Sequence, residues 1–174
     1  MRKINIDKSW RFGHGLYGGL ASFFGSDSSV EVNLPHDYMI AENVSETAPA
    51  GPASGFYTAG VAYYTKLLFL PDEWKDQEIY LNFDGVMMNA TVDINGCKAA
   101  MQHYGYAPFF VNITPYVYFG KENRITVTVN PSMQPNSRWY SGAGIFRSVE
   151  LLHMPKLHIA PNGIFGYTSQ IEYD

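Results

Sequence analysis

The stretch Ala90-Thr91-Val92-Asp93-Ile94-Asn95-Gly96 decides the class of fold. Apolar and polar side chains alternate along it, which is the pattern of a β-strand with one buried face. Asn-Gly then supplies the residue pair that tight hairpin turns prefer, because both residues tolerate a positive φ. The stretch therefore predicts a strand that ends in a hairpin.

The same period of two recurs on both sides of this stretch, and no long helical pattern appears. Short alternating runs bounded by Gly, Pro, Asn or Asp are typical of antiparallel sandwiches. We therefore expect an all-β protein with an antiparallel β-sandwich. The further strands are expected at residues 63–70, 79–83, 109–113, 125–129 and 149–152.

Two stretches interrupt this rhythm. Residues 13–29 are rich in Gly and Ser, and residues 39–60 carry Pro49, Gly51 and Pro52. Loops of this length are unusual in a compact domain and often functional. A surface insertion that closes over one end of a sheet explains them equally well.

The sequence changes character after Leu152, where His-Met-Pro resembles a linker. Residues 156–159 then start another strand-like run that the chain does not complete. We expect a sandwich domain over residues 1–154, and a linker with the incomplete start of a following domain over residues 155–174.

Composition excludes several classes of partner and site. A net charge of −4 gives no basis for binding nucleic acid or an anionic membrane, and no apolar run is long enough to span a bilayer. A single cysteine, Cys97, excludes an internal disulfide. His36 and His103 lack metal-ligand spacing, so no metal site is expected. The start of the chain lacks the apolar stretch of a signal peptide, which leaves bacterial cytoplasm or periplasm open.

Four segments resemble the sugar-binding domain of glycoside hydrolase family 2, and they occur in the family's order. Tyr38 and Tyr63 stand where the family usually carries Trp, and Cys97 stands where a polar residue usually follows the turn. The fourth segment is the most specific and is similar to the β-galactosidase branch. The segments are residues 33–38 (Asn-Leu-Pro-His-Asp-Tyr), 63–71 (Tyr-Tyr-Thr-Lys followed by Leu70-Pro71), 83–96, and 135–147 (Pro-Asn-Ser-Arg-Trp-Tyr-Ser-Gly-Ala-Gly-Ile-Phe-Arg).

The resemblance implies a jelly-roll-type (galactose-binding-like) β-sandwich at the amino terminus of a larger bacterial enzyme. An immunoglobulin-like domain and a TIM barrel would follow it, and the barrel would carry the two glutamates of retaining hydrolysis. In the family the acid/base glutamate directly follows an asparagine, and this chain contains no Asn-Glu pair. We therefore expect no catalytic residue and no cofactor in this chain.

The resemblance and the residue chemistry together nominate four substrate-binding residues. Arg138 is the first choice, because a guanidinium can make several hydrogen bonds to sugar hydroxyls, and the family's matching loop reaches the sugar pocket. Its alternatives are stacking on Trp139 or pairing with a carboxylate. Asn136 is a hydroxyl ligand or a turn former, and Trp139 a sugar platform or a domain anchor. Asp37 either accepts a sugar hydroxyl or fixes the Arg138 loop, and the structural role is favoured.

Three functions remain open at this level. The leading hypothesis is an accessory domain of an exo-acting β-galactosidase that lends a loop to the pocket and packs on the immunoglobulin-like and barrel domains. The second is an independent carbohydrate-binding module, for which the aromatic residues Tyr104, Tyr106, Phe109 and Phe110 offer a platform. The third is a purely structural domain, with a homo-oligomer left open. A β-galactoside is the favoured sugar, while β-glucuronide and β-mannoside stay open.

Overall fold

The computed structural model describes residues 2–18, 29–132 and 139–171, and this part of the chain is built from β-strands. Four short 3-10 helices lie in the connections: η1 (Met39–Ala41), η2 (Gly51–Ser54), η3 (Asp72–Trp74) and η4 (Thr114–Tyr116). The described strands are β1 (Arg2–Asn5), β2 (Trp10–His14), β3 (Val30–Val32), β4 (Ala62–Leu70), β5 (Gln77–Phe83), β6 (Ala90–Ile94), β7 (Cys97–Gln102), β8 (Phe109–Asn112), β9 (Lys121–Val129) and β10 (Val149–Pro155).

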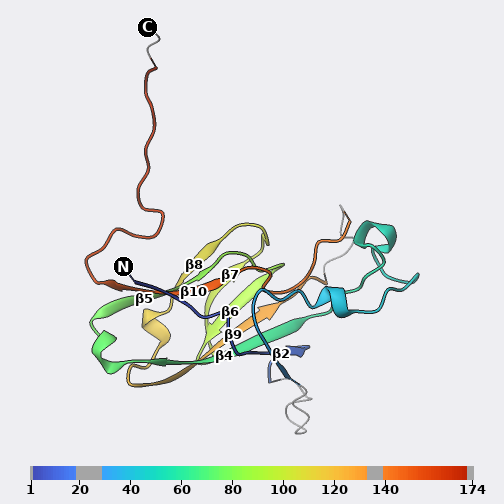
Figure 1. The fold of residues 1–174 in the computed structure, drawn as a ribbon, viewed down its shortest axis with the longest axis horizontal. Helices are drawn as coiled ribbons and strands as arrows, with labels where there is room; N and C mark the ends of the chain where they lie inside the picture. Colours follow the sequence, from blue (N-terminus) through green and yellow to red (C-terminus); the bar gives the residue numbers. More distant parts are fainter. Residues whose placement is uncertain (1, 19–28, 133–138, 172–174) are drawn as a thin grey trace.

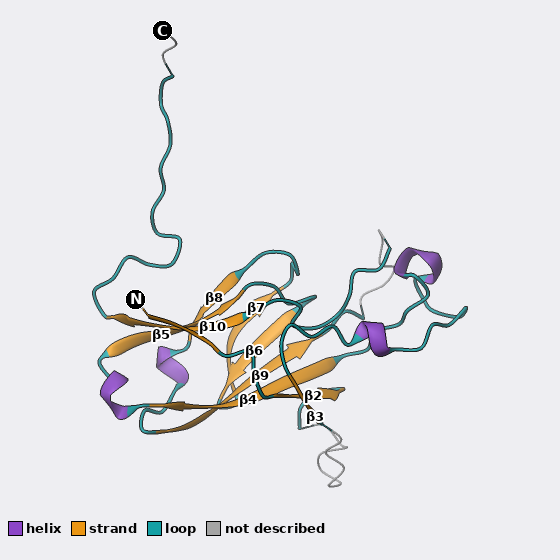
Figure 2. Cartoon of the chain, in the orientation of Figure 1, coloured by secondary structure: helices purple, strands orange, loops and turns teal. Residues whose placement is uncertain are grey.

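These strands form two sheets that make the two layers of a sandwich (Figures 1 and 2). The smaller sheet has the order β1-β10-β5-β8, and the larger has the order β3-β2-β4-β9-β6-β7. Neighbouring strands pair antiparallel in both sheets. The chain crosses between the layers repeatedly, for example from β4 to β5 and from β5 to β6. The expected all-β antiparallel sandwich is confirmed.

Alternation along the strands produces the core between the layers. In β5 and β9 every second side chain is apolar and points inward, and burying a side chain of this size stabilises the fold by about 1.5–3 kcal/mol. Trp10 is also fully buried, and its indole N–H donates to the Ile6 carbonyl oxygen at 2.7 Å, so the polar atom of this side chain keeps a hydrogen-bond partner. The inward side chains of β5 and β9, all inaccessible to solvent, are Ile79, Leu81, Phe83, Ile125, Val127 and Val129.

The hairpin signal at Asn95-Gly96 is confirmed. Strand β6 ends at Ile94, β7 begins at Cys97, and the two pair antiparallel across the turn. Both turn residues have a positive φ, 53° at Asn95 and 85° at Gly96, as the sequence pair predicts.

Strand β2 corrects the expectation that residues 13–29 interrupt the sheet from their start. Gly13 and His14 lie inside β2 and pair with Tyr63 and Ala62 of β4. The glycine marks a close approach here, because a Cβ at residue 13 would lie 2.5 Å from the Tyr63 ring. The ring of Tyr63 thus takes the place of a side chain on this part of β2.

Strand β10 runs on through His153 and Met154 to Pro155, paired with β5, where the sequence resembled a linker. No strand forms over residues 156–159, contrary to expectation, since the described chain offers that run no partner strand. Beyond Pro155 the described residues extend away from the sandwich (Figure 1).

Candidate functional site

The loop over residues 39–60 lies beyond one end of the sandwich, beside the described part of the most specific sequence segment, residues 139–147 (Figure 2). Within that segment, residues 143–145 form a strip between two other loops. On one side, the Tyr38 N–H donates to the Ala143 oxygen at 2.9 Å, and the His36 N–H donates to the Ile145 oxygen at 2.8 Å. On the other side, Gly144 exchanges two bonds with Met87, at 2.8 and 2.9 Å. The strip is therefore fixed from both sides.

Asp37 ties the strip to the loop after β3. Its Oδ1 accepts the main-chain N–H groups of Met39, at 3.0 Å, and Ala143, at 2.9 Å. Its Oδ2 accepts the Tyr140 hydroxyl at 2.6 Å. Burial, and then the bond to Asp37, raise the pKa of Tyr140, so its hydroxyl stays protonated and donates. The contacts of Asp37 are those of a residue that fixes a loop.

A buried polar pair supports the strip from below. The Nδ1 atom of His36 lies 2.8 Å from the Tyr64 hydroxyl, and burial lowers the pKa of His36, with the nearby Asp37 opposing the shift. Gly144 packs directly on this pair, with a φ of 132° that other residues rarely adopt. A Cβ there would lie 2.4 Å from the His36 carbonyl oxygen. Packing therefore explains the glycine.

Trp139 presents its indole on the surface of this cluster. It is 63% exposed, has a φ of 69°, and lies over Gly55 of the long loop. With Ile40, Tyr57 and Tyr140 it lines a shallow hollow of about 290 Å³. The Tyr57 and Tyr140 rings meet edge to face at 5.3 Å, which fixes the floor of the hollow. The hollow joins an apolar wall to a rigid, hydrogen-bonded base.

The two predicted site residues inside the described chain share this cluster. Asp37 accepts a hydrogen bond from Tyr140, and Trp139 directly precedes Tyr140 in the sequence. The structure therefore brings the two predicted residues together. Arg138 and Asn136 lie outside the described residues. Sequence reasoning missed Ile40 and Tyr57, which come from the loop whose length was its only signal, and Tyr140, which stands inside the quoted segment.

The aromatic residues offered as a second sugar platform separate in the structure. Phe109 stacks on Phe83 with ring centroids 4.9 Å apart and belongs to the core packing. Tyr104 and Tyr106 are more than half exposed, and their rings lie 5.7 Å apart. Phe109 thus leaves the platform, while the two tyrosines stay on the surface.

Within residues 2–18, 29–132 and 139–171, no three His, Cys, Asp or Glu side chains come together as a set that could hold a metal ion. Nor does that part of the chain contain a helix with the length and apolar character needed to cross a bilayer.

Residues 24–155 match the family described as "Glycosyl hydrolases family 2, sugar binding domain". That match covers well over half of the sequence, including the loop cluster. The chain belongs to glycoside hydrolase family 2. Its sandwich is the sugar-binding domain of that family, as the four segments indicated.

Relatives of this family 2 domain include enzymes with two different named substrates. A β-galactosidase of Bacteroides ovatus is 35% identical over 172 residues, covering 98% of this chain and 20% of the relative. A putative β-glucuronidase of Formosa agariphila is 37% identical over 147 residues, covering 84% of this chain and 14% of the relative. The chain thus spans about a fifth or less of the length of these relatives.

Solved structures agree with the fold. A crystal structure of a glycosyl hydrolase family 2 member from Bacteroides cellulosilyticus matches with a TM-score of 0.81 and 32% identity, over 89% of this chain and 21% of that one. A β-glucuronidase of Bacteroides uniformis matches with a TM-score of 0.74 and 28% identity, over 93% of this chain and 19% of that one. Both cover the sandwich as one domain of a longer protein.

Proposed function

We propose that this family 2 domain is the non-catalytic amino-terminal part of a retaining exo-glycoside hydrolase that acts on β-galactosides. Its loop over residues 135–147 contributes contacts to the sugar pocket of a catalytic barrel, and the domain packs on that barrel. Hydrolysis itself depends on two glutamates that the barrel supplies, so the chain alone is inactive.

The observation that carries this proposal is the exposed apolar hollow beside Trp139. Apolar surface this concentrated on a loop end is typical of a binding or docking surface. The hollow is also held rigid, since Asp37 fixes Tyr140 and the strip, which reduces the entropy lost on contact with a partner. Trp139 directly follows Arg138 in the sequence, and a rigid apolar contact at Trp139 suits a loop that must be held against a sugar pocket.

Three residues of this loop, together with Asp37 from the loop after β3, have distinct parts in the proposed mechanism. Arg138 donates N–H groups to sugar hydroxyls, and Asn136 offers one donor group and one acceptor to a hydroxyl pair. Trp139 anchors the loop on the neighbouring domain through its apolar face. Asp37 does not reach the sugar and acts by holding the loop that does.

The choice of a galactoside rests on the residue pattern of the fourth segment and on the Bacteroides ovatus relative. Relatives named as β-glucuronidases make the anionic sugar the competing substrate. A glucuronide carries a carboxylate that needs a cationic partner, whereas a galactoside needs hydroxyl ligands only. Kinetics on matched substrates separate the two.

The test is steady-state kinetics of the full-length enzyme on nitrophenyl β-galactoside, β-glucuronide and β-mannoside. We expect the galactoside to be preferred and Arg138→Ala to lower kcat/KM at least ten-fold, a loss of about 1.4 kcal/mol of transition-state stabilisation. Arg2→Ala, on the edge strand β1, is the matched control and should leave the kinetics unchanged.

Two results would overturn the proposal. Wild-type kinetics in a folded Arg138→Ala enzyme would make the domain scaffolding, and preference for the glucuronide would replace the substrate. The chain 1–174 should release no nitrophenol from any of the three substrates, and turnover by it would place a catalytic pair in this domain.

A further inference from the structure

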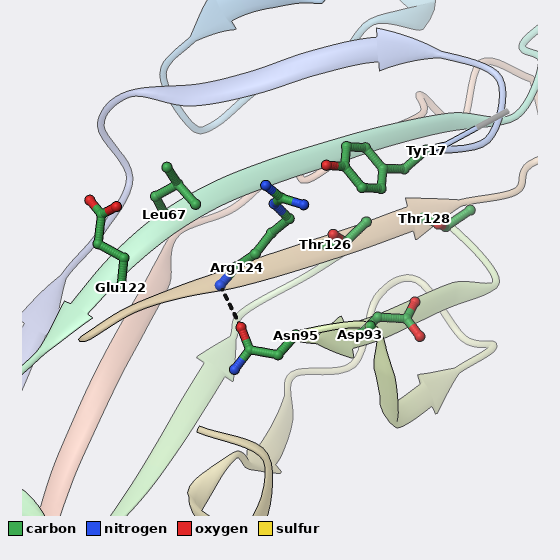
Figure 3. Close-up of a pocket in the computed structure, with 9 residues that line it drawn as sticks. Tyr17, Leu67, Asp93, Asn95, Glu122, Arg124, Thr126 and Thr128 are labelled. Carbon is green, nitrogen blue, oxygen red and sulfur yellow. Dashed lines mark hydrogen bonds between the residues drawn. The ribbon is translucent and has the colours of Figure 1, made fainter. Parts of the chain in front are cut away.

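The outer face of the larger sheet carries a second hollow, which shares no lining residue with the hollow at Trp139. It lies along β9, has a volume of about 640 Å³, and is open to solvent. Arg124, Thr126 and Thr128 stand in a row on β9, with Tyr17 on one side of the row and Asp93 of β6 on the other (Figure 3). The residues that line the hollow come from four separate parts of the chain: residue 17, residue 67, residues 93–96 and residues 122–128.

The main chain under this hollow has no free hydrogen-bonding edge. Thr126 of β9 pairs with Thr65 of β4 on one side and with Asp93 of β6 on the other. Thr128 likewise pairs with residues of both neighbouring strands. A peptide therefore cannot add to the sheet as a further strand at this place. Any ligand must be held by side chains.

Those side chains have free hydrogen-bonding capacity. Within the described part of the chain, the side chains of Asp93, Glu122, Thr126 and Thr128 make no hydrogen bond or ion pair with another residue. None of these oxygens is fully buried without a hydrogen-bond partner. Among the described residues, the side-chain atom in that state is Asn82 Oδ1, which belongs to the other sheet. Two hydroxyls and two carboxylates thus line the hollow without a hydrogen-bond partner among the described residues, and a ligand can supply one.

An aromatic ring and a guanidinium complete the hollow. The Arg124 guanidinium carbon lies 5.5 Å from the centroid of the Tyr17 ring, and Tyr17 meets Tyr63 edge to face at 5.4 Å. These contacts hold Tyr17 over the sheet while leaving 41% of it exposed. The ring offers an apolar face, and Arg124 offers N–H donors beside it.

The balance of groups selects the chemistry of the ligand. Two carboxylates, Asp93 and Glu122, outnumber the one guanidinium that lines the hollow, so an anion is disfavoured. Hydroxyl donors suit the carboxylates, hydroxyl acceptors suit Arg124, and a sugar ring face suits Tyr17. We propose that this hollow binds a neutral glycan chain, as a site separate from the loop cluster and independent of the function proposed for it.

The test is a titration of ¹⁵N-labelled chain 1–174 with neutral β-1,4-galactan and xylan oligosaccharides, followed by amide chemical shifts. The two sheets bury their core within this chain, so the domain can be studied alone. We expect shift changes centred on Thr126 and its neighbours in β4 and β6. A Thr126→Val, Thr128→Val double variant, which keeps the branched shape and removes both hydroxyls, should weaken binding at least ten-fold.

Thr91→Val is the matched control, because Thr91 pairs with Thr128 on the same face but does not line the hollow. It should bind as the wild type does. Three results would overturn the proposal: no binding of either neutral glycan, equal binding by the double variant, or stronger binding of an oligogalacturonate than of its neutral counterpart. Shift changes confined to Trp139 and its neighbours would also overturn it while leaving the loop site standing.

Discussion

At Asp37, three donors converge on the two oxygens of one carboxylate. Two of the donors belong to the segment after residue 138, and one belongs to the loop of Asp37 itself. Charge-assisted bonds of this kind are stronger than neutral ones, and losing the acceptor leaves buried donors unpaired. The stability of the loop cluster should therefore be sensitive to this residue.

We predict that Asp37→Ala lowers the free energy of unfolding of the chain by about 2–4 kcal/mol in urea denaturation. Asp76→Ala is the control, because Asp76 is exposed and its ion pair among the described residues is with the exposed Lys156, at 3.5 Å. Its loss should cost less than about 0.5 kcal/mol. Equal effects of the two substitutions would show that the Asp37 bonds do not stabilise the cluster.

His36 makes stability depend on pH. Burial lowers the pKa of its imidazole in the folded chain below the ordinary value of 6.5, so the unfolded chain takes up the proton first as the pH falls. The stabilising effect is complete above that ordinary value and is lost as the pH drops through the lower folded pKa. We predict that the free energy of unfolding falls as the pH drops from above 6.5 to below it, and that it falls less steeply in the His36→Gln variant.

The measurement is urea denaturation of both proteins across that range. An unchanged slope in His36→Gln would assign the pH dependence to other groups.

At the scale of the element, the turn between β6 and β7 does more than reverse the chain. The Asn95 side chain donates to the Tyr116 carbonyl oxygen at 2.9 Å and to Asn123 Oδ1 at 2.8 Å, and it accepts the Arg124 N–H at 2.9 Å. The turn is therefore attached to the start of β9 and to the connection before it.

We predict that Asn95→Ala destabilises the chain by about 2–4 kcal/mol, because it removes these bonds and strains a residue with a positive φ. Gly96→Ala should cost only about 1 kcal/mol, since a Cβ there meets nothing within 4 Å and the cost is conformational. Thermal or urea unfolding of the two variants gives the comparison. A larger loss at Gly96 than at Asn95 would contradict this account of the turn.

The strands with the clearest alternation could be predicted from the sequence, and the short edge strands β1 and β3 could not. In β5, β6 and β9, burial on one side imposes the alternation that marks a strand. Strands β1 and β3 are short and mostly exposed, and edge strand β7 shows no alternation of burial, so they carry no such pattern. Edge strands acquire their conformation from a neighbour that a local pattern does not show.

The residues of the candidate site also divide into some that the sequence could identify and some that it could not. The quoted segments were enough to place Asp37 and Trp139 among the residues of interest, because both lie inside a recognisable pattern. Ile40 and Tyr57 line the same hollow from a loop with no pattern of its own. Their contribution depends on how the long loop folds back over the end of the sheets, which only the tertiary structure specifies.

At the scale of the whole molecule, the sandwich and the segment after it differ in how they are held. The sandwich contains its own core, whereas the described residues after Pro155 carry large apolar side chains in the open, among them Leu157 at 94% and Phe165 at 86% exposed. Few contacts return from that segment to the sheets, such as the edge-to-face approach of His158 to Tyr80 at 5.9 Å.

We predict that a chain ending at Pro155 unfolds at the same urea concentration as the chain 1–174, because the removed residues contribute little burial. Its tendency to self-associate should fall, since it loses an exposed apolar segment. Urea denaturation and sedimentation velocity measure the two effects. A loss of more than about 1 kcal/mol on truncation would make the segment part of the sandwich.

The strip at residues 143–145 has a consequence for how the length of this domain can vary among enzymes. Its successive residues bond alternately to the loop of His36 and Tyr38 and to Met87, so inserting or deleting one residue would turn each carbonyl toward the wrong loop. The loop over residues 39–60 is held differently, because most of its main-chain bonds, such as those from Gly51 to Ala48 and from Tyr57 to Ser54, close local turns within the loop. Natural and engineered insertions should therefore be tolerated better in the loop over residues 39–60 than in the strip.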